Sequence, residues 1–432
     1  MGPTSARLAV VILVAAGLNL DCVGGLSAST GSSPSPSQAC AWPILANINT
    51  NNGGLVDSAA AYWLDTFHVQ SDLRIVLTGR FPDARYMSIS VYTSSTSLFT
   101  TNGVGADLTD YQIVPNAGSI NPSQKSGPAG GKFTITLRPD PSPGEANTLP
   151  LAPTGTPDGS KGYLQYRVYL PAGGDFSKLV APTITLQQGG HSTTLQNCAK
   201  PGVPSATAPA AATSSPQSTA TASPSATAGR LQFLRPKAQT TSFDFPNADS
   251  AYLITSVVAP GPSSVVVIQA RAPVAPAGDH PSLWPAAMTD VRYWSLCVYE
   301  VVARLPLVVN SLPGGTTDVG CRHDEQTQLD AAGRYTFVIG TESQRAAIEQ
   351  IPGVTFLPFS SAQPTGLYVL LMRNMLVNSA FGFPIQQVPQ DANPASAAAV
   401  LGVYYPKAVK CALSTLTSAG RQAAKALRVN MS

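Results

Sequence analysis

Residues 83–92 read DARYMSISVY, and residues 290–299 read DVRYWSLCVY. Aligned without a gap, the two stretches share six of ten residues: the Asp, the Arg, the first Tyr, the first Ser, the Val and the last Tyr. Chance does not readily produce such agreement, and internal repeats are to be sought before a fold is assigned. The sequence therefore indicates an internal duplication, of which these stretches are the best-matched part.

Further matches follow in the same order along both halves of the chain. They are Ala61-Tyr62 with Ala251-Tyr252, Leu73–Leu77 with Val265–Ile268, Asp110-Tyr-Gln112 with Asp324-Glu-Gln326, Lys132-Phe-Thr134 with Arg334-Tyr-Thr336, and Tyr166-Arg167 through Leu170 with Met372-Arg373 through Leu376. We expect each Ala-Tyr pair to lead into the strand of the second match. Five ordered correspondences predict two copies of one domain.

The two matched stretches alternate in polarity as half-buried strands do. One face of each carries Arg85, Met87, Ile89 and Val91, or Arg292, Trp294, Leu296 and Val298; the other carries Tyr86, Ser88, Ser90 and Tyr92, or Tyr293, Ser295, Cys297 and Tyr299. More strands are predicted at Phe133–Leu137, Leu164–Leu170, Thr183–Leu186, Tyr335–Ile339 and Tyr368–Leu371. The chain is thus predicted to be mainly β, with two tandem antiparallel β-sandwich or jelly-roll domains.

The order of segments is that of an exported protein. Arg7 and the apolar run Leu8–Leu20 precede mostly small residues, so residues 1–28 are predicted to be a signal peptide. The run has 13 residues, short of the roughly 18 to 20 that span a bilayer, and we predict no membrane span. The remaining segments are predicted as a flexible stretch at 29–39, a first sandwich at 40–200, a Pro/Ser/Ala/Thr linker at 201–230 and a second sandwich at 231–405.

Cys22 allows a second interpretation, because a cysteine just after an apolar run is how bacterial lipoproteins begin. Asp21 speaks against it, since such signals resemble a pattern with Gly, Ala or Ser directly before the cysteine. Charged residues make up 11% of the chain, against roughly 25% in ordinary soluble domains, which favours an extracellular protein. The small net charge of +3 predicts no nucleic-acid partner. We expect a secreted or envelope-associated protein.

Few helices are predicted. A short one is expected at Glu342–Gln350, and a longer, basic one within Pro406–Leu427, in the C-terminal segment 406–432. The basic residues of this segment, which contains no acidic residue, are Lys407, Lys410, Arg421, Lys425 and Arg428. The tail either touches an anionic envelope polymer or membrane surface or packs as a helix with a solvated face, which we favour.

The cysteines fit an exported compartment. Cys40 and Cys198 stand at the two ends of the first sandwich, where strand ends can lie close together, and we predict that they pair. In the second sandwich Cys297, Cys321 and Cys411 cannot all pair internally, and the sequence leaves the connectivity open. Cys297 with Cys321 is preferred because both flank one strand connection, which leaves Cys411 as a thiol.

Seven strings carry a family resemblance: residues 81–88 (FPDARYMS), 110–115 (DYQIVP), 167–171 (RVYLP), 247–252 (NADSAY), 292–297 (RYWSLC), 333–336 (GRYT) and 373–376 (RNML). They resemble strings of uncharacterised secreted actinobacterial proteins related to domain-of-unknown-function families with Arg-Tyr-Tyr/Trp-Ser strands. The resemblance covers most of residues 40–410 and implies a β-sandwich architecture. It implies no activity and therefore transfers no catalytic residue.

No familiar catalytic motif is present. The four histidines lack the spacing of a zinc site, and the chain has no nucleophile elbow, phosphate loop or calcium loop; we expect neither metal nor cofactor. The one polar cluster, Arg322-His323-Asp324-Glu325, could supply a general acid or base from His323, Asp324 or Glu325 if it lines a cleft. We favour the alternative, a surface turn before the strand at Arg334.

Arginines on apolar strand faces need partners. We expect Arg85 to pair with Asp110 and Arg292 with Asp324 inside each sandwich, and a carboxylate to lie beside Arg167 and Arg373. The same arginines and Asp110, with Tyr293 and Tyr299, could instead form a ligand pocket. The aromatic residues Tyr86, Tyr92, Tyr293, Tyr299 and Trp284 could likewise stack on sugar rings, although we favour packing under a covering loop or helix.

Two functional classes follow. The favoured one is an exported, non-catalytic envelope or extracellular protein that binds polysaccharide, lipid or protein, or has a structural role. The alternative is a secreted hydrolase of an envelope or extracellular polymer with its site in the second sandwich, which requires a deep pocket with convergent titratable groups. A pocket lined by His323, Asp324 or Glu325 together with Arg292 or Arg373 would favour the hydrolase.

Overall fold

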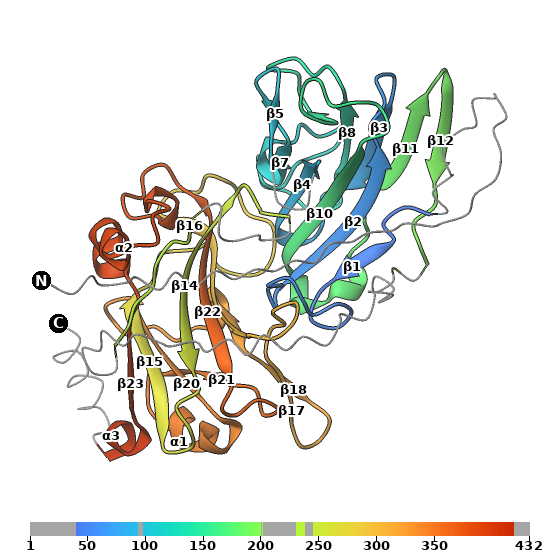
Figure 1. Cartoon of the computed structure of the whole chain (residues 1–432). Helices are drawn as coiled ribbons and strands as arrows, with labels where there is room; N and C mark the ends of the chain where they lie inside the picture. The colour runs from blue at the N-terminus through green and yellow to red at the C-terminus, as the bar shows by residue number, and fades with distance from the viewer. Residues whose placement is uncertain (1–39, 94–97, 200, 202–229, 238–244, 419–432) are drawn as a thin grey trace, which may run out of the picture.

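The computed structural model of the chain describes residues 40–93, 98–199, 201, 230–237 and 245–418. They form a mainly β protein whose sheets fall into two halves, one on each side of the linker (Figure 1). The predicted two-sandwich architecture is confirmed. The predicted signal peptide (1–28), Cys22, the stretch 29–39 and nearly all of the linker 201–230 lie outside the described residues.

The first half contains two five-stranded sheets. We name the one that faces the second half its interface sheet (order β1-β2-β10-β4-β7), and the other its outer sheet (order β12-β11-β3-β8-β9). The strands are β1 (Ile44–Ala46), β2 (Ala60–His68), β3 (Arg74–Arg80), β4 (Ala84–Tyr92), β5 (Thr100–Thr101), β6 (Val104–Gly105), β7 (Asp107–Thr109), β8 (Lys132–Arg138), β9 (Thr148–Pro150), β10 (Lys161–Pro171), β11 (Thr183–Gln188) and β12 (His191–Leu195). Short 3-10 helices are η1 (Asp110–Gln112), η2 (Ala172–Gly174) and η3 (Phe176–Lys178).

The second half has an interface sheet of order β14-β22-β16-β19 and an outer sheet of order β13-β23-β15-β20-β21. Its strands are β13 (Arg230–Leu231), β14 (Ser250–Val258), β15 (Ser264–Arg271), β16 (Val291–Glu300), β17 (Val309–Ser311), β18 (Thr317–Val319), β19 (Cys321–His323), β20 (Arg334–Gly340), β21 (Thr355–Pro358), β22 (Leu367–Val377) and β23 (Lys407–Ala412). Its helices are η4 (Asp324–Gln326), η5 (Glu342–Gln344), α1 (Arg345–Glu349), η6 (Ile385–Gln387), α2 (Pro394–Leu401), η7 (Gly402–Tyr404) and α3 (Leu413–Ser418).

The two halves share one topology, as a duplication predicts. In the interface sheets β2, β10, β4 and β7 correspond in order to β14, β22, β16 and β19. In the outer sheets β11, β3, β8 and β9 correspond to β23, β15, β20 and β21. Even the departure from antiparallel pairing is repeated, because β8 with β9 and β20 with β21 are parallel and hold the same place in each half.

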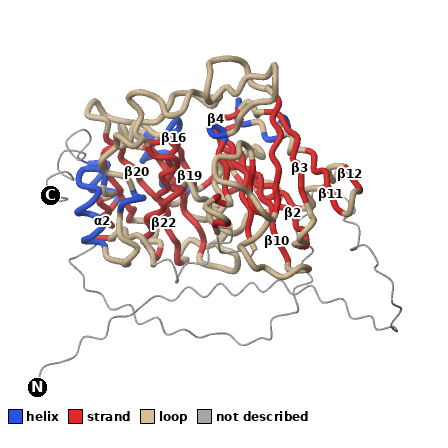
Figure 2. The backbone as a smooth tube through the Cα atoms, turned by 90° about the horizontal axis from the view of Figure 1, so that it is seen from above, coloured by secondary structure: helices blue, strands red, loops and turns tan. Residues whose placement is uncertain are grey.

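Each half buries an apolar core between its two sheets. In the first half, Met87, Ile89 and Val91 of β4 pack in one cluster with Leu77 and Ile135 of the outer sheet. The other face of β4 is not exposed, since all nine of its residues are buried, and β16 is buried except for its last residue. The prediction of half-buried strands was therefore wrong: the opposite half covers the second face, which gives four successive sheet layers (Figure 2).

Strands β10 and β22 carry the same irregularity near their ends. Leu170 and Leu376 have φ angles of 48° and 45°, a left-handed conformation that leucine rarely adopts. Neither residue is in register with a partner on β4 or β16. Their N–H groups instead donate to the carbonyls of Ala59 and Asp249 at 2.8 Å. These two left-handed residues thus hold the segments that precede β2 and β14, which reach the opposite half.

Two local predictions need correction. Ala61-Tyr62 and Ala251-Tyr252 do not lead into β3 and β15 but lie within strands of their own, β2 and β14. The predicted basic helix within Pro406–Leu427 begins as a strand, because residues 407–412 pair with β15 and bury Ala408, and only α3 is helical. The tail residues Arg421, Lys425 and Arg428 lie outside the described residues. The short helix expected at Glu342–Gln350 is present as η5 and α1.

Two disulfides form, Cys40–Cys198 and Cys297–Cys321, and Cys411 is a partly buried free thiol. This is the connectivity predicted from the sequence. Disulfides persist in oxidising compartments, so the two bridges indicate an oxidising, extracellular milieu. Among the described residues, no helix has the length and apolar character needed to cross a membrane.

We expect the double variant Cys40→Ser/Cys198→Ser to lose about 2 to 4 kcal/mol of unfolding free energy, because the bridge restricts the unfolded chain. Its cysteines are separated by 158 positions in the sequence. Equilibrium urea unfolding measures the loss. The matched control is Cys411→Ser, which removes an unbridged thiol and should shift the midpoint little. A double variant as stable as this control would contradict a stabilising role for the bridge.

Candidate functional site: a polar interface between the two halves

The interface sheets of the two halves pack against each other through aromatic side chains. The rings of Tyr86 and Tyr169 meet edge to face with centroids 5.6 Å apart, and those of Tyr169 and Tyr293 with centroids 5.3 Å apart. Met375 and Leu376 belong to the same buried cluster. Tyr86 and Tyr169 come from the first half and Tyr293 from the second, so this cluster joins the halves. The polar residues predicted as site candidates surround it.

Arg85 of the first half reaches into the second half. Its guanidinium pairs with Asp324 and, at 3.0 Å, with Glu325, and its Nε donates to the Gly278 carbonyl at 2.7 Å. The side chain of Arg85 is fully buried. A buried guanidinium is tolerated only when counter-charges and acceptors replace its water shell, and here the second half supplies all of these.

Arg292 makes the reciprocal crossing. It donates to both carboxylate oxygens of Asp110 at 2.8 and 3.1 Å, to the Ser123 hydroxyl at 3.0 Å and to the Arg85 carbonyl at 2.8 Å. The ion pairs predicted inside each sandwich, Arg85 with Asp110 and Arg292 with Asp324, are therefore wrong. The copies have exchanged partners, and since the partners are equivalent residues of a duplication, the sequence pattern is the same for either arrangement.

Matching 3-10 turns place the exchanged carboxylates. Each turn, η1 or η4, begins with the Asp directly after an edge strand of the interface sheet. The third residue, Gln112 or Gln326, accepts through Oε1 the N–H of the residue before the turn, Thr109 at 3.0 Å or His323 at 3.4 Å. This capping is the structural reason for the repeated Asp-x-Gln pattern, and it fixes each Asp at the border between the halves.

Arg373 lies at the centre of the second interface sheet and pairs with Asp57 of the first half. The same carboxylate accepts the hydroxyl of Tyr293 at 2.7 Å and that of Ser295 at 2.8 Å. Asp57 is completely buried, so the guanidinium and two hydroxyls replace its water. The carboxylate expected beside Arg373 is present, and it too comes from the opposite half.

Arg167 holds the place of Arg373 in the first half but has a different environment. Within the described residues its hydrogen-bond acceptors are uncharged: the Ser90 hydroxyl at 2.6 Å, the Tyr92 hydroxyl, and the carbonyls of Phe245 at 2.6 Å and Pro246 at 3.3 Å. The carboxylate predicted within salt-bridge reach of Arg167 is thus not found among the described residues, which do not include Asp244. When Ala61-Tyr62 is aligned with Ala251-Tyr252, Asn247 stands where the first copy has Asp57, which removes the corresponding charge.

The three catalytic candidates lie in the interface. Asp324 and Glu325 are bound to Arg85, and the His323 ring stacks on Tyr293; its Nδ1 has no hydrogen-bond partner among the described residues. Burial raises the pKa of Asp324 to about 6, against the opposing effect of Arg85, and lowers the pKa of His323 to about 4. The expected surface turn is correct in part: Glu325 and Gln326 are exposed, whereas His323 before the turn is only 8% exposed and Asp324 faces the first half.

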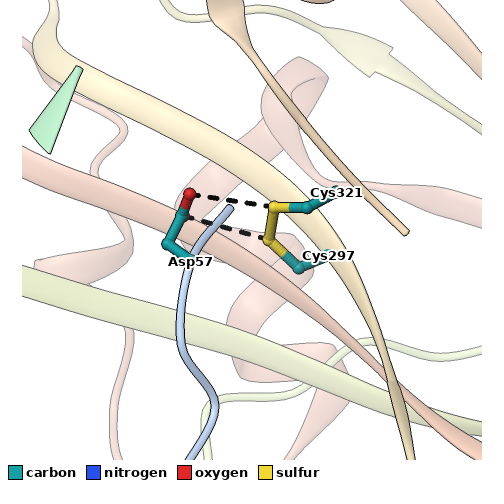
Figure 3. Close-up of side chains that lie close together, drawn as sticks. All are labelled: Asp57, Cys297 and Cys321. Carbon is teal, nitrogen blue, oxygen red and sulfur yellow. Dashed lines mark hydrogen bonds between the residues drawn. A yellow bond between two sulfur atoms is a disulfide. The ribbon is translucent and has the colours of Figure 1, made fainter. Parts of the chain in front are cut away.

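The Cys297–Cys321 disulfide joins directly opposite residues of β16 and β19 and lies against Asp57 (Figure 3). The two sulfurs are 3.9 and 3.8 Å from the carboxylate oxygens. Two thiolates and a carboxylate can hold a metal ion, but here the sulfurs are bonded to each other and the carboxylate is paired with Arg373. The group fits a covalent link within the second sheet that also contacts the first half.

The remaining ligand candidates are covered by the opposite half. Tyr92 and Tyr299 are completely buried, and their hydroxyls donate to the carbonyls of Pro246 at 2.7 Å and Val56 at 3.0 Å. Trp284 is buried as well. A carbohydrate platform made of these rings is excluded by their burial. The favoured interpretation, packing, is correct, although the cover is a sheet and its flanking segments from the other half instead of a loop or helix.

Asp57 and Asp249 are interface residues that the sequence reasoning missed. Each begins an Asp-Ser-Ala string that ends in Tyr, namely residues 57–62 (DSAAAY) and 249–252 (DSAY). A search for short repeated strings would have found both, although strand register, with Tyr62 opposite Arg167 and Tyr252 opposite Arg373, places Asn247 and not Asp249 at the position of Asp57. Asp249 accepts the Tyr86 hydroxyl at 2.8 Å and the Thr109 hydroxyl, so it crosses from the second half to the first, as Asp57 crosses in the other direction.

No family model and no curated protein matches the chain. Similar solved structures include an uncharacterised protein from Burkholderia cenocepacia, with a TM-score of 0.46 and 11% identity over 87% of this chain and 83% of that one. Another is the VPA0106 protein from Vibrio parahaemolyticus, with a TM-score of 0.42 and 10% identity over 82% of this chain and 90% of that one. Neither similarity assigns the chain to a family.

We expect Arg292→Ala to destabilise the protein by about 3 to 5 kcal/mol, because the substitution leaves Asp110 buried without its counter-charge. Urea unfolding of the whole chain measures the change. Arg138→Ala is the matched control, since Arg138 pairs with Asp140 and Glu145 at the surface; its cost should stay below about 1 kcal/mol.

A double-mutant cycle distinguishes the exchanged pairing from pairing within one half. Arg292→Ala and Asp110→Ala should couple by about 1 to 3 kcal/mol, because the two groups touch. The coupling of Arg292→Ala with Asp324→Ala should be clearly smaller. A larger coupling with Asp324 than with Asp110 would contradict the exchange of partners.

Proposed function

We propose that the chain is an exported, non-catalytic binding or structural protein of the cell envelope or the extracellular space. The observation that supports this proposal is that the charged residues of the duplicated stretches bind each other between the two halves. Arg85 engages Asp324 and Glu325, and Arg373 engages Asp57, all between the two halves. A general acid or base must reach the substrate proton it transfers. The opposite half covers His323 and Asp324 almost completely, and the exposed Glu325 is held by Arg85 and by the Gly278 N–H.

The same contacts favour a single unit made of both halves, here called the two lobes, over two halves that act independently. Three buried ion pairs cross the interface, Arg85 with Asp324, Arg292 with Asp110 and Arg373 with Asp57. Separating the lobes would expose or strand each of these charges together with the tyrosine cluster. We therefore expect a partner, whether polysaccharide, lipid or protein, to be bound on the outer surfaces of the joined lobes.

A secreted hydrolase with its site in the second half is the second candidate. The shifted pKa values of Asp324 and His323 favour it, because catalytic groups often titrate abnormally, but buried structural ion pairs do so as well. A hollow in the second half is lined by other residues, among them Leu253, Arg271, Tyr335, Phe381 and Tyr404. The candidate acid and base therefore do not converge on it.

Sedimentation of the whole exported chain with insoluble cell-wall polymer, neutral vesicles or anionic vesicles tests the proposal. We expect the protein to sediment with one of these, and the polymer to release no more soluble fragments than a protein-free blank. Fragments released by the wild type and by Arg138→Ala, but not by folded Asp324→Asn or His323→Ala, would favour the hydrolase. A protein that sediments with none of the three would contradict a binding role at these surfaces.

A further inference from the structure

The interface contains two related polar centres that differ in charge. We name them the balanced centre (Arg373, Asp57, Tyr293 and Ser295) and the unbalanced centre (Arg167, Asp107, Asp249, Ser90 and Thr109). In the balanced centre one guanidinium is paired with one carboxylate. In the unbalanced centre Arg167 acts electrostatically on two carboxylates, Asp107 of the first half and Asp249 of the second. Among the described residues, the second centre thus carries one acid more than its arginine can neutralise.

Strand register places the groups of the unbalanced centre side by side. On β4 and β7, Ser90 lies opposite Asp107 and Ser88 lies opposite Thr109, while Arg167 of β10 lies opposite Ser88 from the other side. The Ser90 hydroxyl accepts from Arg167 at 2.6 Å and donates to Asp107, so a single hydroxyl connects the guanidinium with this carboxylate. The Ser88 hydroxyl is buried and has no hydrogen-bond partner in the described part of the chain.

Asp249 closes the unbalanced centre from the opposite half. Its carboxylate accepts the hydroxyls of Thr109 and, at 2.8 Å, of Tyr86. Arg292 also acts on Asp249 electrostatically, but it is itself bound to both oxygens of Asp110. That second arginine is therefore already matched by a carboxylate and does not remove the excess of acid.

The comparison of the two halves shows where the extra carboxylate comes from. Cys321 lies opposite Cys297 on β19 and β16, as Asp107 lies opposite Ser90 on β7 and β4. In the aligned repeats Cys297 matches Ser90. One copy therefore has a neutral disulfide where the other has a hydroxyl hydrogen-bonded to an acid, and at this position only the first copy carries a charge.

We propose that the unbalanced centre holds one proton while the halves are closed, carried mainly by Asp107, and that the halves separate more readily once this proton is lost. A proton converts two carboxylates and one guanidinium into a neutral set, matching the balanced centre. Without it, two like charges from opposite halves, each only partly exposed, lie beside Ser90 and Thr109 in the same interface, and such a pair cannot ionise fully without cost.

The direction of the pH dependence follows from the protonation of the closed and open states. Burial, and then repulsion from Asp249, raise the pKa of Asp107 to about 7 in the closed protein, whereas a solvated Asp titrates near about 3.9. Between these values the closed state binds the extra proton, so closing is favoured at low pH. The opening constant should rise by up to about tenfold per pH unit from about 4 to about 7 and level off above.

Other groups of the interface titrate in the same window, so the test must compare variants. The raised pKa of Asp324, about 6, acts in the same direction as Asp107, and the lowered pKa of His323, about 4, acts in the opposite direction. The pKa of Asp249 is also raised by burial. Substituting Asp107 alone isolates its part, because Asn is a neutral equivalent of the protonated acid.

The experiment is amide hydrogen exchange of the whole chain between pH 5 and 8.5, corrected for intrinsic exchange and followed in β4, β10 and β14. We expect the opening constant of Asp107→Asn to rise at least tenfold less over this range than that of the wild type. The matched control Asp158→Asn, which removes an exposed carboxylate of the same half, should keep the wild-type profile. An Asp107→Asn profile that parallels the wild type would overturn the proposal.

A second variant keeps the proposal testable if Asp107→Asn does not fold. Asp249→Asn removes the other carboxylate and leaves Asp107 with Arg167, so the repulsion disappears and the pH dependence of opening should shrink in the same way. An unchanged profile in a folded Asp249→Asn protein would overturn the proposal independently. Because the readout is the opening of the interface, its outcome is separate from any binding or hydrolytic activity.

Discussion

The structure depends on arginine–carboxylate pairs that cross from one sandwich to the other. A guanidinium cannot shed its charge when it is buried, so each buried arginine requires an anion at a fixed place. Arg85, Arg292 and Arg373 all find that anion in the opposite half. Neither sandwich is electrostatically complete alone, and this explains why both faces of β4 and β16 are buried in strands whose sequences look half-exposed.

The exchange has the form of an isologous dimer interface contained in one chain. In a two-fold dimer, residue i of one subunit contacts residue j of the other, and j contacts i in return. Arg85 with Asp324 and Arg292 with Asp110 are related in this way, as equivalent positions of the duplicated sequence. The long linker between the halves suits such an arrangement, because it has only to connect the ends of two domains whose orientation is set by the interface.

The sequence predicted where the strands lie, but it did not predict which half supplies the partner of each buried arginine. Both outcomes have physical reasons. The repeated stretches located β4 and β16, and the Asp-x-Gln repeat located η1 and η4. Both features are local, because alternation of polarity and capping of a turn depend on residues that are close together in the sequence. The rule that a buried arginine needs an acid also held for three of the four arginines. A duplicated sequence, however, contains each Arg and each Asp twice, and nothing local distinguishes pairing within a copy from exchange between copies. The role of Asp57 could not be predicted for a related reason, since Tyr293 and Arg373, which bind its carboxylate, lie more than 200 positions away.

The interface is most nearly symmetric at the arginine–carboxylate pairs, where both copies use the same residues. It is least symmetric at the two polar centres, where the copies differ. The exchanged arginine pairs are nearly identical, and they form the part of the interface that must be matched for the halves to join. The divergence falls on the two sheet centres: Asn247 aligns with Asp57, and Ser90 with Asp107 takes the place of the Cys297–Cys321 bridge. One centre has thereby become neutral and covalently fixed, while the other has kept an ionisable excess.

A substitution at a matched pair would weaken both ion pairs that cross the interface, since Arg292 donates to the main chain of Arg85 as well as to Asp110. A substitution at one of the diverged centres affects that centre alone. The joined halves can therefore differ in charge from one centre to the other, which a single copy could not do.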